Sequence, residues 1–446
     1  MQERRWLLEG VERPDADALD VYRRNGGYGG AWRAFDEIDA RAVIDEVEKA
    51  GLRGAGGGWR HVGTRWRQAA GQDVRALVVD VTESEAGRFR DRKLAERLPH
   101  RLIEGALIAA HALAADEVYL CIRADWRRAR SVLGHALAEA EAAGWIGRPL
   151  GRSGHAVKFQ VHPVPGPLPA RGGDHLLPNL IECSRPEPRA ADGVDALPTL
   201  FGASVFVHCA ATLGYLPSIL SRGADAFRAL GGKDFPGTVA VSVSGHVRRP
   251  GLFEIEIGSG SFGDVIDDLA GGTVADGESL AIFCDGAPAL RGEAIWSAPV
   301  DPAAWSHPGG GPQMGSFGSG TIVVADESVA PIELAANWLR DAAELGCGQC
   351  PGCREGSAWL AKQLQRLREG GVAGVDLPAF EARLQELATS EADGLSICGH
   401  PTVAALITQG LLQIAPEDLS QQAKPGVEPC TNDGPLRTAD SIHLRF

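Results

Sequence analysis

The chain has 446 residues and a formal net charge of −14, and 44% of its residues are hydrophobic. This length allows about two or three domains with buried cores. The acidic charge and the lack of Lys/Arg-rich runs argue against a nucleic-acid surface and a polybasic membrane face. The N-terminal residues lack the apolar core of a signal peptide, and no run of about 18 apolar residues occurs, so we expect no membrane insertion.

Nine cysteines are present, and four of them belong to a motif described below. An odd remainder without regular spacing is typical of reduced thiols in the cytoplasm and not of a disulfide framework. We therefore expect a cytoplasmic protein. The five remaining cysteines are Cys121, Cys183, Cys209, Cys284 and Cys430.

From about residue 40 the hydrophobic pattern alternates between strand and helix, which favours an α/β domain with parallel strands and right-handed crossovers. Residues 163–175 carry prolines at every second position at their start, so we expect an extended loop without a helix there. The expected strands cover 76–81, 117–122 and 156–161, and the expected helices cover 98–115 and 127–143.

The pattern changes near residue 237. Two alternating runs, 238–247 and 252–257, flank a Pro-Gly turn and predict a β-hairpin. A helix around 262–270 follows, so this region reads as a small β-plus-helix module. Beyond a Gly- and Pro-rich loop at 308–320, the expected elements are a strand at 321–325 and helices at 331–345 and 357–368.

The most informative motif is Cys347-Gly-Gln-Cys-Pro-Gly-Cys-Arg-Glu-Gly356, with Cys398 farther along the chain. Three thiolates two residues apart and a distant fourth match the ligand pattern of a [4Fe–4S] cluster. Glycines between them allow tight turns and bring backbone N–H groups towards the cluster sulfurs. A structural zinc site is the alternative, although zinc sites favour two separated cysteine pairs, and unrelated buried thiols are a further alternative. The proposed ligands are Cys347, Cys350, Cys353 and Cys398.

This motif resembles the cysteine loop of the NADH-binding flavoprotein subunit of respiratory complex I and of its relatives in soluble hydrogenases and formate dehydrogenases. Other segments resemble the same family in the same order and cover most of the chain. They are residues 25–28, 51–54, 83–92, 101–105, 185–189 and 244–251.

The resemblance implies a fold class and a division into domains. We expect an α/β Rossmann-like flavin-type domain, then a ubiquitin-like β-grasp module, and then a C-terminal helical-bundle iron–sulfur domain. The corresponding ranges are 1–236, 237–307 and 308–420, followed by a loosely ordered tail at 421–446.

The resemblance also implies a chemistry, in which NADH transfers a hydride to FMN and single electrons pass to the [4Fe–4S] cluster. It implies FMN or NADH contacts for seven residues and assigns no catalytic residue. These seven are Gly54, Gly56, Gly57, Arg65, Glu83, Glu85 and Thr212.

The first glycine-rich loop departs from the family pattern. Trp59 takes a glycine position, where its indole would fill space that a cofactor would use. Arg60 replaces the aromatic ring that stacks on nicotinamide, and Arg65 replaces a lysine with a bulkier fork. These changes weaken the expectation of NAD(P)H binding.

Three later positions depart as well. Asp80 and Thr82 stand where the family has Asn and Asp against the flavin ring, and His208-Cys209 replaces a pair of asparagines. The family's flavin-covering tyrosine is absent, and only Asp174 remains acidic in that segment. The scaffold and the cluster loop therefore resemble the family more closely than the nucleotide pocket does.

Three functions are consistent with this combination. The first is an iron–sulfur electron-transfer subunit of a redox complex that has lost or remodelled NADH use. The second is an active FMN-dependent NAD(P)H dehydrogenase with a divergent pocket, and the third is a non-catalytic structural subunit. Redox subunits, either thioredoxin-like or multi-cluster iron–sulfur proteins, are the partners that the resemblance implies.

Overall fold

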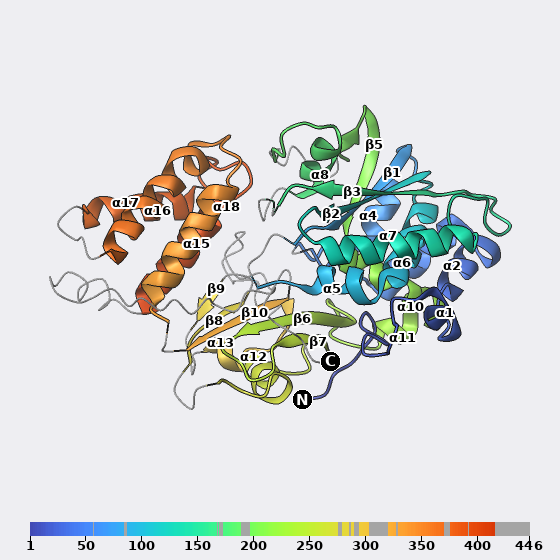
Figure 1. The fold of residues 1–446 in the computed structure, drawn as a ribbon, viewed down its shortest axis with the longest axis horizontal. Coiled ribbons are helices and arrows are strands. Elements are labelled where there is room, and N and C mark those ends of the chain that lie inside the picture. Colours follow the sequence, from blue (N-terminus) through green and yellow to red (C-terminus); the bar gives the residue numbers. More distant parts are fainter. Residues whose placement is uncertain are drawn as a thin grey trace.

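The computed structural model describes residues 1–56, 58–83, 87–166, 168, 173–188, 197–274, 279–284, 287–289, 294–302, 320–326, 329–369, 375–390 and 392–414. Two candidate site residues, Gly57 and Glu85, and the tail at 421–446 lie outside these ranges. Figure 1 shows an α/β part, a second sheet below it and a group of helices on the other side of the molecule.

The first sheet has five strands in the order β3-β2-β1-β5-β4. The central strand β1 runs parallel to both β2 and β5, and β2 runs parallel to β3, which confirms the predicted parallel α/β arrangement. The short strand β4 is antiparallel at the other edge. The bounds are β1 Val74–Val81, β2 Glu117–Arg123, β3 Lys158–Val164, β4 Thr199–Leu200 and β5 Ala203–Cys209.

Strand β3 differs from its predicted range of 156–161. It begins at Lys158 and continues through Pro163 to Val164, into the segment that we expected to be a loop. A proline is tolerated there because β3 is an edge strand, whose outward N–H positions need no partner in the sheet.

Helices cover both faces of this sheet. On one face α6, Pro99–Ala112, is buried along its whole length and packs against β1 and β2. On the other face α8, Gly173–Ile181, packs against β1, β4 and β5 and begins inside the segment that we expected to be free of helix. Burial on both faces explains why β1 has a nearly continuous apolar sequence.

The remaining helices of this part are mostly short. The expected helix at 127–143 is confirmed as α7. The bounds are α1 Leu19–Arg24, α2 Gly29–Trp32, α3 Ala40–Ala50, α4 Val62–Ala69, α5 Arg90–Arg97, α7 Arg127–Ala142, α9 Ala210–Gly214, α10 Leu216–Arg222 and α11 Ala224–Arg228, with a π-helical turn at Arg33–Glu37.

The second sheet also has five strands, in the order β7-β6-β10-β8-β9. The predicted hairpin is confirmed as the antiparallel pair β6 and β7. Strand β10 lies parallel to β6 and antiparallel to β8, so a segment that we grouped with residues 308–420 is the central strand of this sheet. The bounds are β6 Thr238–Gly245, β7 Gly251–Glu256, β8 Ser279–Cys284, β9 Ala287–Ala289 and β10 Thr321–Asp326.

A helical segment packs on the second sheet. Helix α12, Phe262–Asp264, begins at Ser261, whose side chain accepts a hydrogen bond from the Asp264 N–H in a capping box. It continues as a π-helical turn at Val265–Leu269, and Phe262 and Val265 are buried against the strands. A short helix, α13 Ala294–Ser297, lies beside it.

Four longer helices form the third part of the molecule (Figure 1). The predicted apolar stripe Leu360, Leu364 and Leu367 is buried in their shared core. No helix in the described ranges is long and apolar enough to cross a membrane. The bounds are α15 Pro331–Leu345, α16 Ala358–Arg368, α17 Leu377–Thr389 and α18 His400–Ile414.

Candidate functional site

The four motif cysteines converge at one end of the helical part. Burial and then the neighbouring Cys350, Cys398 and Cys347 thiols raise the pKa of Cys353, which shows that all four groups lie close together. Cys350 and Cys353 are only 3% and 4% exposed, whereas Cys347 and Cys398 are half-buried. The structure thus brings together the residues that the sequence motif singled out.

The backbone around Cys353 explains this convergence. Cys353 lies in a π-helical turn, Gly352–Ser357, that packs against all four long helices. A Cβ at Gly352 would lie 3.1 Å from Leu387 and 3.2 Å from Pro401, so the glycine allows α17 and the start of α18 to approach the turn. We expected this glycine to clear space for cluster sulfurs, but its bare side faces Leu387 and Pro401 instead. Gly348 has a left-handed φ of +79°, which confirms the expected tight turn.

The spacing of the cysteines bears on the kind of metal site. Within the described ranges, no three or more His, Cys, Asp or Glu side chains are grouped so that they could hold one metal ion. Ligands of an iron–sulfur cluster bind different iron atoms, whereas the ligands of zinc share one tetrahedral ion. The arrangement therefore favours a cluster over a structural zinc ion.

A second group of candidate residues lies at the carboxyl edge of the first sheet, where the loops after parallel strands meet. The N–H of Ala55, between Gly54 and Gly56, donates to Thr212 Oγ1 at 2.9 Å. Thr212 Oγ1 also lies 2.9 Å from the Cys209 sulfur, and a Cβ at Gly56 would lie 3.6 Å from that sulfur. The structure therefore brings the glycine-rich loop and Thr212 together, as predicted.

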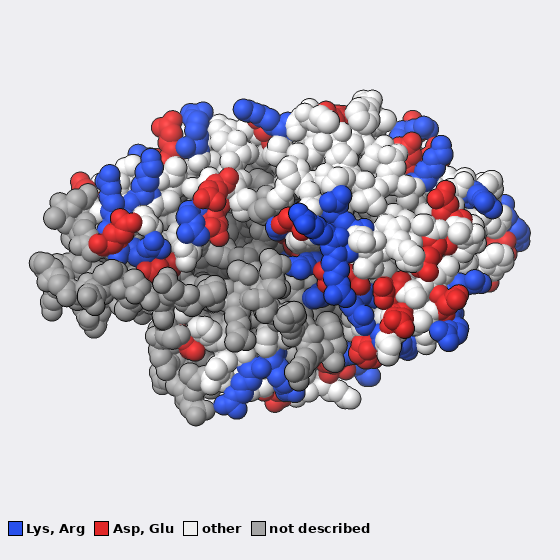
Figure 2. All heavy atoms as spheres, in the orientation of Figure 1, with Lys and Arg blue, Asp and Glu red and all other residues white. Residues whose placement is uncertain are grey.

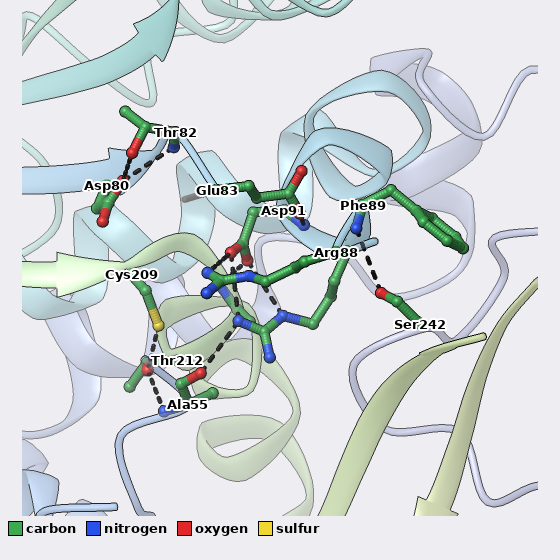
Figure 3. Close-up of polar contacts among 12 residues, drawn as sticks. Ala55, Asp80, Thr82, Glu83, Arg88, Phe89, Asp91, Cys209, Thr212 and Ser242 are labelled. Carbon is green, nitrogen blue, oxygen red and sulfur yellow. Dashed lines mark hydrogen bonds and ion pairs between the residues drawn. The ribbon is translucent and has the colours of Figure 1, made fainter. Parts of the chain in front are cut away.

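Asp91 is the centre of a buried polar network beside this loop (Figure 3). Arg88 and Arg90 each form an ion pair with its carboxylate, at 2.5 and 3.2 Å. The N–H of Ala211 donates to Asp91 at 3.0 Å, and Arg90 donates to the Ala55 carbonyl at 3.1 Å. Burial acts to raise the pKa of Asp91, but the two guanidinium groups outweigh it and hold the pKa at about 2.

This network was missed at the level of sequence. Its residues belong to the segment 83–92 that resembled the family, yet only Glu83 and Glu85 were considered as ligands. Alternating basic residues around one aspartate were the available signal. Their partners Ala55 and Ala211 come from distant segments that only folding brings close.

Glu83 lies next to this network. It is 5% exposed and adopts a left-handed backbone with φ of +48°, which is rare for a residue other than glycine. Its Oε1 accepts a hydrogen bond from the Asp91 N–H at 2.5 Å. Burial, followed by the Asp91 carboxylate, raises the pKa of Glu83 to about 8.

Arg65 reaches the opposite side of the sheet edge. Its guanidinium pairs with Asp174 of α8 at 3.0 Å and lies over the Phe206 ring at 4.8 Å from its centre. The acidic residue that remained in the divergent segment, Asp174, is therefore the partner of the arginine that replaces a lysine. Burial lowers the pKa of Arg65 from its ordinary value.

The positions that depart from the family are largely paired with one another. Asp80 Oδ1 accepts hydrogen bonds from the N–H and the hydroxyl of Thr82, at 2.9 and 2.7 Å. Trp66 Nε1 donates to His208 Nε2 at 2.7 Å. Burial, followed by the charge of Arg65, keeps the pKa of His208 well below its ordinary value, so the imidazole is neutral.

Trp59 packs towards the second sheet. Its ring meets Phe235 edge-on at 5.9 Å and joins the partly buried residues around that core. Trp59, Ala55 and Arg90 help to line a cavity of about 10 Å³, which is room for about one water molecule. The indole thus borders the filled space behind the glycine-rich loop.

The surface charge around this part is uneven. Figure 2 shows Lys and Arg side chains gathered in a band over α5 and the adjoining end of α7, although the chain as a whole is acidic. Both helix sequences begin with arginines, Arg90 in α5 and Arg127 in α7.

Two family models match the chain. The model described as the Nuo51 FMN-binding domain matches residues 47–213, and the NADH-ubiquinone oxidoreductase-F iron–sulfur binding region matches residues 333–422. The first range contains the glycine-rich loop, Glu83 and Thr212, and the second contains all four motif cysteines.

Curated relatives agree with these matches, and each is an F-type component of NADH-quinone oxidoreductase. The second such protein of Rhizobium meliloti is 31% identical over 387 residues, covering 84% of this chain and 88% of that protein. The protein of Aquifex aeolicus is 29% identical over 419 residues, covering 94% of both chains. The protein of Escherichia coli is 29% identical over 411 residues, covering 91% of this chain and 90% of that protein.

A solved structure has a similar fold. The NAD⁺-reducing [NiFe]-hydrogenase in its H₂-reduced state superposes with a TM-score of 0.76 at 24% identity, covering 95% of this chain and 68% of that chain. At this identity the match supports the fold alone.

Proposed function

The chain belongs to the family of F-type components of NADH-quinone oxidoreductase, and from this premise we propose that it is an iron–sulfur electron-transfer subunit of a redox complex in which NADH oxidation is lost or remodelled. The observation that carries the proposal is the convergence of the four cysteine thiols around Cys353. A bound [4Fe–4S] cluster supplies one-electron storage at this site.

The cysteines have distinct roles in this proposal. The buried Cys350 and Cys353 would hold the inner side of the cluster, and the half-buried Cys347 and Cys398 would hold the side nearer to solvent. The helices around the π-helical turn at Gly352–Ser357 exclude water from the inner side. All four cysteines are ligand candidates of equal standing.

The loss of NADH use is supported by the pairing of groups that would otherwise recognise a flavin. Thr212 accepts from Ala55, Asp80 from Thr82, and His208 from Trp66. Each of these pairs satisfies a buried polar group inside the protein and leaves less capacity for a cofactor. On these contacts the described residues fit a flavin poorly, and no step is assigned to FMN or NADH.

A second candidate is an active FMN-dependent NAD(P)H dehydrogenase with a divergent pocket. One observation favours it: Glu83 keeps a strained backbone and a buried carboxyl beside the matched FMN-binding region, features that cluster at functional sites. In this reading Gly54, Gly56, Gly57, Arg65, Glu83, Glu85 and Thr212 would contact the cofactors. A non-catalytic structural subunit is the third reading.

The proposal includes an architecture and a setting. We assign a Rossmann-like domain to 1–236, a ubiquitin-like β-grasp module to the second sheet and an iron–sulfur domain to the four long helices. Because β10 pairs with β6 and β8, the module draws its central strand from beyond residue 307. A thioredoxin-like or multi-cluster iron–sulfur subunit is the proposed partner, and we propose a cytoplasmic location because Cys121, Cys183 and Cys209 are free thiols.

The test is a cofactor assay on protein purified without oxygen, with iron and FMN released by acid and counted per chain. About four iron atoms without FMN would support the one-electron subunit. Stoichiometric FMN with the same iron would favour the dehydrogenase, and less than about one iron per chain would contradict both.

A further inference from the structure

The carboxyl group of Glu83 has one oxygen without a use in the fold. Oε1 accepts from the Asp91 N–H, but Oε2 is buried and meets no hydrogen-bond partner among the residues that the structure describes. A buried carboxylate oxygen without a donor is costly, and the left-handed φ of +48° adds backbone strain at the same residue. The fold therefore tolerates two separate costs at Glu83.

The charges around Glu83 disfavour its ionised form. Asp91 lies beside it as a buried carboxylate, and Asp80 of β1 and the Cys209 thiol of β5 add no positive charge. Arg88 and Arg90 are the nearby cations and favour ionisation of Glu83, but both form ion pairs with Asp91. Figure 3 shows the two guanidinium groups gathered at Asp91. One carboxylate of the pair is thus neutralised and the other is not.

We propose that Glu83 is the proton-holding residue of this sheet edge, with a proton on Oε2 at neutral pH. Negative charge that arrives there with an anionic ligand or an electron then meets a neutral carboxyl and not a second carboxylate. The role is that of a positioning residue, because it acts through the charge of the Asp91 network. It goes beyond the proposed electron transfer and holds whether or not FMN binds.

The backbone contacts give this proton a structural consequence. Asp91 is held by Ala211, and Arg90 by Ala55, so the network joins the helix after β5 to the glycine-rich loop. Phe89 extends it to the second sheet, because its N–H donates to Ser242 Oγ at 3.3 Å. Ionisation of Glu83 would place a second negative charge against the point where these three segments meet.

The direct test is infrared spectroscopy of the full chain, comparing the wild type with Glu83→Gln. Glutamine has the shape of a protonated glutamate, so the variant should fold. In the wild type we expect the carbonyl band of a protonated carboxyl at pH 7, fading with a midpoint near the Glu83 pKa of about 8, and we expect this band to be missing from Glu83→Gln. Identical spectra of the two proteins at pH 7 would overturn the proposal.

A control and a second measurement secure the assignment. Glu104 is also a buried carboxyl, but it accepts hydrogen bonds from Tyr22, Tyr28 and Ala31, so Glu104→Gln should leave the band that fades near pH 8 in place. Thermal unfolding from pH 6 to 9 should show a fall in melting temperature for the wild type that is smaller in Glu83→Gln. Equal pH dependence, or a Glu83→Gln chain that cannot fold, would mean that the ionised carboxylate is required and would overturn the proposal.

Discussion

Gln349 Nε2 donates a hydrogen bond to the carbonyl oxygen of Pro188, with 2.9 Å between the two atoms. Gln349 lies between Cys347 and Cys350, and Pro188 belongs to the segment after α8. Asn179 of α8 in turn donates to the Glu187 carbonyl at 3.2 Å. The cysteine loop is therefore attached to the α/β part by a contact made within the motif itself.

Replacing this glutamine should loosen the attachment without removing the cluster. In Gln349→Ala we expect unchanged iron content and faster amide exchange in residues 185–188 and 347–350, because a hydrogen bond worth about 1 kcal/mol is lost. Hydrogen exchange followed by mass spectrometry measures this. Gln365→Ala is the control, since Gln365 pairs only locally with Glu369 on α16; loss of iron in Gln349→Ala would show that the residue supports the ligands instead.

Each of the four motif cysteines should be needed for iron binding. Replacing Cys347, Cys350, Cys353 or Cys398 by serine should remove most of the brown chromophore, because a serine hydroxyl does not replace a thiolate ligand. Iron content and the visible spectrum measure the effect. Cys183→Ser, at an exposed thiol, is the matched control, and a full set of about four iron atoms in Cys398→Ser would disprove the ligand set.

NADH should not reduce the protein. Without oxygen, we expect no bleaching of the visible absorbance on adding NADH, because the groups that would recognise a flavin are paired internally. Dithionite should bleach the same sample and shows that the cluster is reducible. Prompt bleaching by NADH would favour the dehydrogenase reading.

Stability should depend on pH through Glu83. Its folded pKa of about 8 lies above the ordinary value of 4.5, so the folded form binds the proton more tightly than the unfolded form does. The stabilisation is complete below pH 4.5 and is lost as pH rises to about 8, by at most about 1.4 kcal/mol per pH unit. Denaturant unfolding at several pH values should show a shallower decline for Glu83→Gln; parallel curves would contradict the assignment.

Asp91 should be essential to the stability of the α/β part. Asp91→Asn removes the carboxylate that Arg88 and Arg90 share and should cost about 3–5 kcal/mol of unfolding free energy, as is usual when one partner of a buried ion pair is lost. Asp225→Asn breaks an exposed pair with Lys49 and should have no measurable effect. Chemical denaturation measures both, and equal stability of the two variants would disprove the central role of Asp91.

Local sequence was sufficient to predict those features that depend on short-range spacing. The strand β1, the helix α6 and the hairpin of β6 and β7 follow from hydrophobic periodicity over a few residues. The cysteine motif was equally readable, because three of its four members lie within seven residues and their chemistry does not depend on what surrounds them. The family resemblance added the expected chemistry and the order of the domains.

Only the tertiary structure decided which distant groups meet. Periodicity records that a residue is buried but not what it is buried against, so the contacts of Asp91 with Ala211, of Trp66 with His208 and of Gly352 with Leu387 could not be predicted. The same limit explains why β10 was grouped with the helices, since strand pairing depends on hydrogen bonds to β6 and β8 from far along the chain. The sequence by itself therefore determined the cluster ligands and the α/β pattern, and long-range packing decided which of the remaining polar groups are paired with one another and which, like Glu83 Oε2, are not.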